Sequence, residues 1–218
     1  MTYIDIHTHT WYESPDTTIL LNVFAGDSRN LERQVFKSLG LHPWHIHDQT
    51  YNNLLDSLKE SVRHDGVIAI GETGLDKSIK TNYKLQNKVF STQLDMAESM
   101  KKPLIIHCVR SYSEMLAYRK KSDKKIPWIF HWFNADIQVA RELIKKNCYL
   151  SFGHMLFNDQ SRAFRSFPEI PTDNLFFETD DAGYSIRQIY EKAAQLRKIP
   201  EDELKMCIMN NFTRCFQI

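Results

Sequence analysis

A histidine pair near the start of the chain is the first group that could do chemistry. His7 and His9 end a short apolar segment that reads Asp5-Ile6-His7-Thr8-His9. Residues two apart in a β-strand point to the same side, so the two imidazoles would share one face at the strand's end. Two neutral imidazoles on one face suit a borderline divalent metal ion. A lone pair of this kind is more often an ordinary surface or core pair, so it predicts a metal site only with further ligands.

Four more apolar runs end in a side chain that can bind a metal: Glu72, His107, His131 and Asp180. Any one of these could be a satisfied core group, and Asp180 could simply cap the segment that follows it. Repetition at five strand ends is hard to explain by packing, because a buried charge is costly unless it is paired or coordinates a metal. Four histidines and two carboxylates exceed what one ion needs. They fit two ions that share a bridging carboxylate, roughly 3.5–4 Å apart.

The elements that must position these residues are short apolar runs alternating with longer amphipathic segments. The runs lack clean alternation, which is typical of strands buried on both faces. We expect strands at 3–9, 18–24, 34–41, 67–72, 103–108, 128–133, 148–152 and 174–179. Apolar residues at three- and four-residue spacing predict helices at 51–63, 83–100, 111–121, 136–146, 185–197 and 201–216.

Strand–helix alternation predicts an α/β fold with a parallel sheet. Eight strands favour a TIM-type (β/α)8 barrel, whose active sites gather at the carboxyl ends of the strands. Residues 10–17 and 25–33 are too short for full helices, so we expect the barrel to be trimmed or distorted near its first strands. An open doubly wound sheet is the alternative. We expect residues 1–218 to form a single hydrolase domain.

Composition is that of an ordinary globular chain, with 218 residues, 42% hydrophobic and 25% charged. The 28 basic and 27 acidic residues leave a net charge of +1, which argues against coating nucleic acid by bulk charge but leaves room for a local basic groove. The four cysteines form no CxxC pair, which favours reduced thiols in a cytoplasmic protein. No signal peptide, membrane span or obligate protein partner is predicted.

The motifs, in their order, resemble the TatD-type metal-dependent deoxyribonucleases. They read His7-Thr8-His9, Gly40-Leu41-His42-Pro43, Gly71-Glu72-Thr73-Gly74-Leu75-Asp76, Pro103 to Arg110, His131-Trp132-Phe133, Glu178-Thr179-Asp180 and Asn211 to Phe216. Each motif is moderately specific, whereas their order and spacing together are highly specific. The resemblance spans nearly the whole chain.

The resemblance implies a role for each ligand. His7, His9 and Asp180 would hold one metal ion, His107 and His131 the other, and Glu72 would bridge them. The activity it implies is hydrolysis of phosphodiester bonds in DNA, as a 3′→5′ exonuclease, by a water that the two ions activate. Asp180 would also orient that water or take its proton, which makes Asp180 and Glu72 the expected catalytic residues. The softness of four imidazoles favours zinc, manganese or iron over magnesium.

Three further residues are candidates for binding substrate. Arg110 could clamp a phosphate bidentately or form a surface salt bridge. His42 could touch the phosphate or support a ligand, and His154 could bind phosphate or be a plain rim histidine. His45 and His47 are better explained as a solvated loop. Four aromatic residues could stack on splayed bases or close the core: Trp11, Trp44, Trp132 and Phe133.

Two departures from the family pattern bear on substrate preference. Asp181-Ala182-Gly183-Tyr184 replaces the proline that usually follows the Glu-Thr-Asp-Ala motif, and the segment between His9 and Gly40 is short. These features and the neutral charge keep open a metal-dependent esterase or deacylase acting on a non-nucleic or aminoacyl ester. A non-catalytic barrel is the third hypothesis, and the complete ligand set speaks against it.

Overall fold

The computed structural model describes residues 2–218, in which strands and helices alternate along the chain. The strands follow one another in the sheet in chain order, and the pairs whose register is defined are parallel. This is the order of a (β/α)8 barrel, and the expected TIM-type fold class is confirmed. The strands are β1 (Tyr3–Thr8), β2 (Thr17–Phe24), β3 (Phe36–Gly40), β4 (Val67–Asp76), β5 (Leu104–Val109), β6 (Trp128–Phe130), β7 (Cys148–Phe152) and β8 (Leu175–Phe177).

The helices follow the predicted pattern closely. They are α1 (Ser28–Leu31), α2 (Tyr51–Ser61), α3 (Tyr83–Met100), α4 (Tyr112–Lys121), α5 (Ile137–Ile144), α6 (Arg162–Ser166), α7 (Ile186–Arg197) and α8 (Glu201–Phe216). Short 3₁₀ turns are Pro43–His45, His154–Phe157, Phe167–Glu169 and Thr172–Asn174. The four-residue α1 and the helix-free link from β1 to β2 confirm the trimming predicted near the first strands. The short α6 was not predicted.

Backbone contacts divide the chain into two compact units. Unit 1 comprises Met1–Leu21 and Phe130–Ile218, and unit 2 comprises Asn22–Ile129. Each unit carries its own strands, its own covering helices and its own share of the predicted site residues. The prediction of one domain over residues 1–218 stays a prediction.

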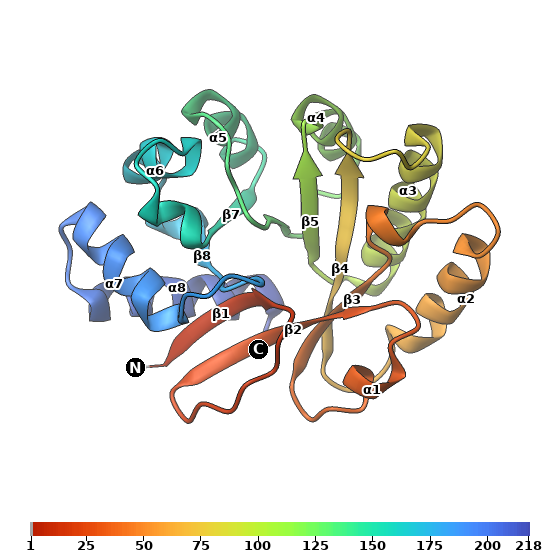
Figure 1. The fold of residues 1–218 in the computed structure, drawn as a ribbon, viewed down its shortest axis with the longest axis horizontal. Helices are drawn as coiled ribbons and strands as arrows, with labels where there is room; N and C mark the ends of the chain where they lie inside the picture. Colours follow the sequence, from red (N-terminus) through yellow and green to blue (C-terminus); the bar gives the residue numbers. More distant parts are fainter. Residues whose placement is uncertain (1) are drawn as a thin grey trace. The chain divides into compact units, whose positions relative to one another are not determined.

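Unit 1 is built from an N-terminal and a C-terminal segment of the chain. β1 runs beside the end of β8, where the Asp180 N–H donates to the His7 carbonyl oxygen at 2.9 Å. The buried Tyr190 of α7 fixes that helix to β1, because its hydroxyl lies 3.2 Å from both the N and the O of Ile4. In Figure 1, α7 and α8 lie near β1 and β8, which agrees with the contacts between these elements. The ligands at the ends of β1 and β8 are therefore held in one packed layer.

Unit 2 is built on the pairing of β3, β4 and β5, with α3 and α4 packed against β4 and β5 (Figure 1). Gly74 permits the close approach of β4 and β5, because a Cβ at this position would lie 1.8 Å from the His107 carbonyl oxygen. The fully buried Arg119 of α4 donates to the carbonyl oxygens of Asp123 and Ile126 at 3.0 and 2.9 Å, which fixes the link from α4 to β6. This rigid frame carries the predicted ligands of β4 and β5.

Candidate functional site

Unit 1 gathers four predicted ligands. His7 lies in β1, and His9 follows the strand's end, with ring centroids 5.0 Å apart. The His131 ring, which follows β6, has its centroid 4.3 Å from that of His7. Asp180 Oδ1 lies 3.1 Å from His9 Nε2 and 3.7 Å from His7 Nε2. His7, His131 and Asp180 offer donor atoms that all lie within 4.8 Å of one another, as a metal ion requires.

Electrostatics keep Asp180 charged in this cluster. Burial alone would raise the pKa of Asp180, but the hydrogen bond to His9 and the charges of His7 and His131 outweigh it and hold the pKa below its ordinary value. Asp180 also has φ +54°, a left-handed conformation that turns the chain sharply where β8 ends. The carboxylate is thus ionised and aimed by its turn at the two histidines.

Two acidic residues of unit 1 support the ligands, and sequence reasoning gave them no role. Asp5 is buried and accepts hydrogen bonds from Thr179 N at 3.0 Å, Thr179 Oγ at 2.7 Å and the Tyr12 hydroxyl at 2.9 Å. Burial raises the pKa of Asp5 to about 6, even though these hydrogen bonds lower it. Asp5 therefore ties the loop after β1 and the turn before Asp180 to the strand that carries His7.

Glu178 is the second supporting carboxyl group. It is fully buried, accepts a hydrogen bond from the Trp132 N–H, and has an oxygen 3.8 Å from His131 Nδ1. Burial raises its pKa to about 8, although the neighbouring His131 lowers it. Trp132 has φ +45°, so Glu178 braces a sharp turn beside His131. Its position two residues before Asp180 was the signal that could have identified it.

Unit 2 gathers a second cluster around Glu72. The Glu72 Oε1 atom lies 2.9 Å from His107 Nδ1 and 3.0 Å from His42 Nε2, and all three side chains are buried. The Glu72 N–H donates to the side-chain oxygen of the buried Asn22 at 3.0 Å, which fixes the backbone that carries the carboxylate. The donor atoms of His42, Glu72 and His107 lie within 4.8 Å of one another. The structure therefore groups His42 with two predicted ligands.

Asp76, four residues after Glu72 in β4, orients this second cluster. Its Oδ2 lies 3.1 Å from His107 Nε2 and accepts the Trp44 indole N–H at 2.8 Å, while its Oδ1 accepts the Ser78 N–H at 2.7 Å. Burial opposes ionisation, but the hydrogen bonds from His107, Ser78 and Trp44 hold the pKa of Asp76 well below its usual range. A carboxylate behind a ligand histidine fixes the ring and its tautomer. Sequence reasoning assigned Asp76 no role, although its even spacing from Glu72 was visible.

Both clusters have the chemistry of divalent-metal sites. Each combines imidazole nitrogens with a carboxylate oxygen, a donor set that suits zinc, manganese or iron. The unit 1 cluster lies where β1 and β8 end, and Glu72 and His107 lie in the C-terminal halves of β4 and β5, on the side where active sites of barrels usually lie. The residues present therefore fit a metal ion in each unit.

The comparisons with known proteins decide the family. A family model described as TatD related DNase matches residues 23–217, nearly the whole chain. The chain belongs to the TatD family of metal-dependent hydrolases. It is 30% identical over 201 residues to the uncharacterized metal-dependent hydrolase YabD of Bacillus subtilis, covering 84% of this chain and 78% of that protein. It is 32% identical over 172 residues to the human 3'-5' RNA nuclease TATDN2, covering 75% of this chain and 22% of that protein.

Solved structures agree on the fold. A TatD homologue from Escherichia coli, YJJV, superposes with a TM-score of 0.86 at 20% identity, covering 99% of this chain and 98% of that one. A TatD family hydrolase from Entamoeba histolytica gives a TM-score of 0.82 at 14% identity, with 99% and 98% covered. At these identities the likeness supports the TatD-type TIM-barrel fold.

Of the substrate-binding candidates of this TatD family member, His42 is buried in the unit 2 cluster, whereas Arg110 and His154 are exposed or partly exposed. Arg110 follows β5, is exposed, and has φ +53°. His154 begins the 3₁₀ turn after β7, partly exposed, with its ring centroid 6.1 Å from that of Trp132. Among the four aromatic candidates, Phe133 is buried in the core, and the three tryptophans are exposed. The roles of Arg110 and His154 in binding phosphate stay predictions.

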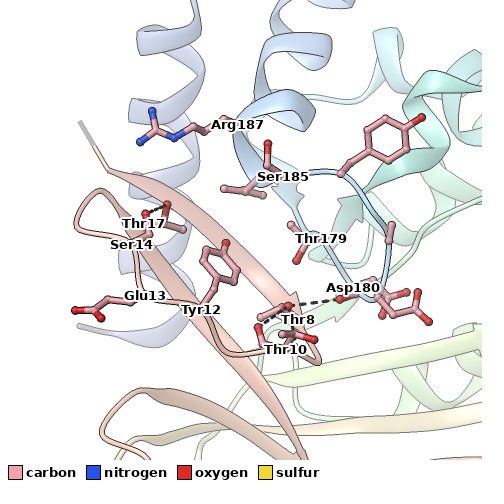
Figure 2. Close-up of a pocket in the computed structure, with 14 residues that line it drawn as sticks. Thr8, Thr10, Tyr12, Glu13, Ser14, Thr17, Thr179, Asp180, Ser185 and Arg187 are labelled. Carbon is pink, nitrogen blue, oxygen red and sulfur yellow. Dashed lines mark hydrogen bonds between the residues drawn. The ribbon is translucent and has the colours of Figure 1, made fainter.

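A pocket of about 450 Å³ lies in unit 1, between the loop after β1 and the start of α7. Figure 2 shows Tyr12 on that loop, Ser185 before α7, and Thr179 between them. Three carboxylates line the pocket, those of Glu13, Asp180 and Asp181. Among the described residues its one lining cation is Arg187, which pairs with Asp16. The described residues therefore give this pocket an excess of negative charge.

No helix in the described part of the chain is both long enough and apolar enough to cross a membrane.

Proposed function

We propose that this TatD family hydrolase is a divalent-metal-dependent phosphodiesterase that releases nucleotides from the 3′ end of single-stranded DNA. The observation that carries the proposal is the pair of imidazole–carboxylate clusters, one in each unit, each with donor atoms within 4.8 Å. The family's description as DNase-related and the naming of a human relative as a 3'-5' RNA nuclease support a nucleic-acid substrate. RNA is therefore the substrate to test beside DNA.

The proposed metal ligands are His7, His9 and Asp180 for one ion and His107 and His131 for the other, with Glu72 as the bridge. The grouping of His7, His131 and Asp180 supports ligands in unit 1, and the grouping of His42, Glu72 and His107 supports ligands in unit 2. His42 joins the candidates as a ligand or as a group that touches the substrate phosphate. The bridging role of Glu72 stays a prediction, as does a cytoplasmic location.

When bound, divalent ions would lower the pKa of a water molecule and draw charge from the phosphate oxygens. The chain's own residues prepare that chemistry. Asp180, ionised at neutral pH, is an acceptor that can orient the attacking water. Asp76 holds the His107 ring in place through Nε2. Arg110, which is exposed after β5, would bind two oxygens of one substrate phosphate.

One observation favours a second function. The pocket of unit 1 combines the Glu13, Asp180 and Asp181 carboxylates with threonine and serine hydroxyls, and Arg187, the cation among its described lining residues, is paired with Asp16. Glu13 and Asp181, which are not candidate metal ligands, would attract an ammonium group even with an ion on Asp180. A metal-dependent esterase that cleaves aminoacyl esters is therefore the alternative.

The test is hydrolysis of three substrates with added Mn²⁺: single-stranded DNA, single-stranded RNA and an aminoacyl ester. We expect nucleotide release from DNA, abolished by chelation and by Glu72→Ala, and unchanged in Glu142→Gln, whose surface pair with Lys145 is remote from either cluster along the chain. Turnover of the ester without nucleotide release would replace the first function with the second. Release of nucleotides by Glu72→Ala at the wild-type rate would contradict the metal-dependent proposal.

A further inference from the structure

The tryptophan next to the unit 2 cluster is unusually exposed for so large a ring. Trp44 has 58% of its surface exposed, compared with 39% for Trp11, 39% for Trp132 and 0% for Trp128. It belongs to the 3₁₀ turn Pro43–His45, and Pro43 before it is buried. So exposed a ring adds little to core packing, and tryptophan is a residue that binding interfaces favour.

Trp44 is exposed but held in one orientation. Its indole N–H donates to Asp76 Oδ2 at 2.8 Å, and its ring centroid lies 5.2 Å from that of His42 at an interplanar angle of 84°. Its backbone N–H donates to His42 Nδ1 at 3.1 Å, so the turn that carries the ring is also fixed. A ring that is already ordered loses little entropy on binding, which favours its use as a contact surface.

We propose that Trp44 is a stacking platform for one base of a single-stranded nucleic acid, an inference that rests on the proposed nuclease function. The hydrogen bond from Nε1 to Asp76 occupies only one edge of the indole. Because 58% of the Trp44 surface is exposed, part of the ring is accessible to a base. Every base has a π-face, so such a platform accepts any sequence. It selects against duplex, whose bases already stack on one another.

The position of Trp44 links binding to the cluster. Its ring centroid lies 6.1 Å from that of His107, and Asp76 Oδ2 contacts both side chains. A base stacked on Trp44 would therefore belong to a nucleotide that lies next to the candidate ligands His42 and His107. The platform would hold a strand in register, with its phosphodiester near the Glu72 carboxylate.

The test is the affinity of the metal-free protein for a short fluorescent single strand, measured by anisotropy in EDTA, so that no hydrolysis occurs. A second strand of equal length and charge carries abasic sites in place of bases. We expect Trp44→Ala to weaken binding of the normal strand about 5- to 150-fold and to leave the abasic strand unaffected. Trp44→Phe keeps a ring and should retain most of the affinity.

The matched control is Met206→Ala, which removes another exposed apolar side chain, 48% exposed on α8, and should bind both strands as the wild type does. Circular dichroism checks that each variant is folded. Equal losses for normal and abasic strands in Trp44→Ala, or wild-type affinity in that variant, would overturn the stacking role while leaving the nuclease proposal standing. Failure of the wild-type protein to bind the normal strand would also overturn the platform, whereas the proposed function fails if no nucleotide is released in the Mn²⁺ assay.

Discussion

Asp76 offers the sharpest test of how the fold prepares a metal ligand. In the unit 2 cluster, His107 has Nδ1 2.9 Å from Glu72 Oε1 and Nε2 3.1 Å from Asp76 Oδ2. Because the ionised Asp76 accepts the Nε2 proton, the Nδ1 lone pair is the one available to an ion on the Glu72 side. Removing Asp76 frees the ring to rotate and to change tautomer, so we expect metal affinity to fall.

The size of the loss follows from the kind of contact removed. Changing the partner behind a ligand histidine typically lowers metal affinity about 10- to 100-fold, or about 1.4–2.7 kcal/mol. Asp76→Asn keeps an oxygen acceptor without the charge, and charge-assisted hydrogen bonds are roughly twice as strong as neutral ones. We therefore expect Asp76→Asn near the lower end of the range and Asp76→Ala near the upper end.

The assay is isothermal titration of the metal-free protein with Zn²⁺ or Mn²⁺, with thermal unfolding in EDTA as a separate measure of stability. Glu114→Gln is the control, because its carboxylate pairs with Lys77 at the surface and should not alter metal affinity. If Asp76→Ala is folded and binds the ion as tightly as the wild type, the assignment of Asp76 as the positioning residue of His107 is wrong.

Three predictions concern the frame that holds the clusters. Gly74→Ala should prevent stable folding, because its Cβ would lie 1.8 Å from the His107 carbonyl oxygen, and a soluble variant with the wild-type melting temperature would refute this. Tyr12→Phe deletes the 2.9 Å hydrogen bond to the buried Asp5 and should lower the free energy of unfolding by about 1–3 kcal/mol in urea titrations; an unchanged midpoint would count against it. Arg119→Met removes the donor to the buried Ile126 carbonyl oxygen and to that of Asp123, and should lose on the order of 3 kcal/mol by the same measurement. A gain in stability would show that the arginine can be replaced by apolar packing.

The sequence predicted the fold class and most of the elements, because strands buried on both faces produce apolar runs that need no tertiary information. The trimmed region was also predictable, since nine residues between two strands leave no room for a long helix. Strand ends were less accurate. β6 ends at Phe130 because Trp132 adopts φ +45° just beyond it, and no residue pattern indicates that turn. β4 continues to Asp76 because polar residues such as Thr73 are buried in it, which an apolar run cannot reveal.

The candidate ligands were predictable in type but not in grouping. A histidine or carboxylate at a strand end shows which residues face the same edge of the sheet, whereas a distance across strands depends on register and rotamer. The 3.0 Å distance from His42 Nε2 to Glu72 Oε1 depends on register and rotamer in this way, so the sequence did not predict it. Asp5, Asp76 and Glu178 were missed as supporting residues for the same reason, since each acts through a hydrogen bond to a residue on another segment.

The most direct test of the central claim is the number of divalent ions bound per chain, measured by titration of the metal-free protein with elemental analysis of the product. A two-metal hydrolase should bind two ions in the wild-type chain. Asp180→Ala should lose the ion assigned to His7, His9 and Asp180, and His107→Ala the ion assigned to His107 and His131, so each variant should bind one. A wild-type chain that binds no ion, or variants that both still bind two, would contradict the claim that these two clusters are the metal sites.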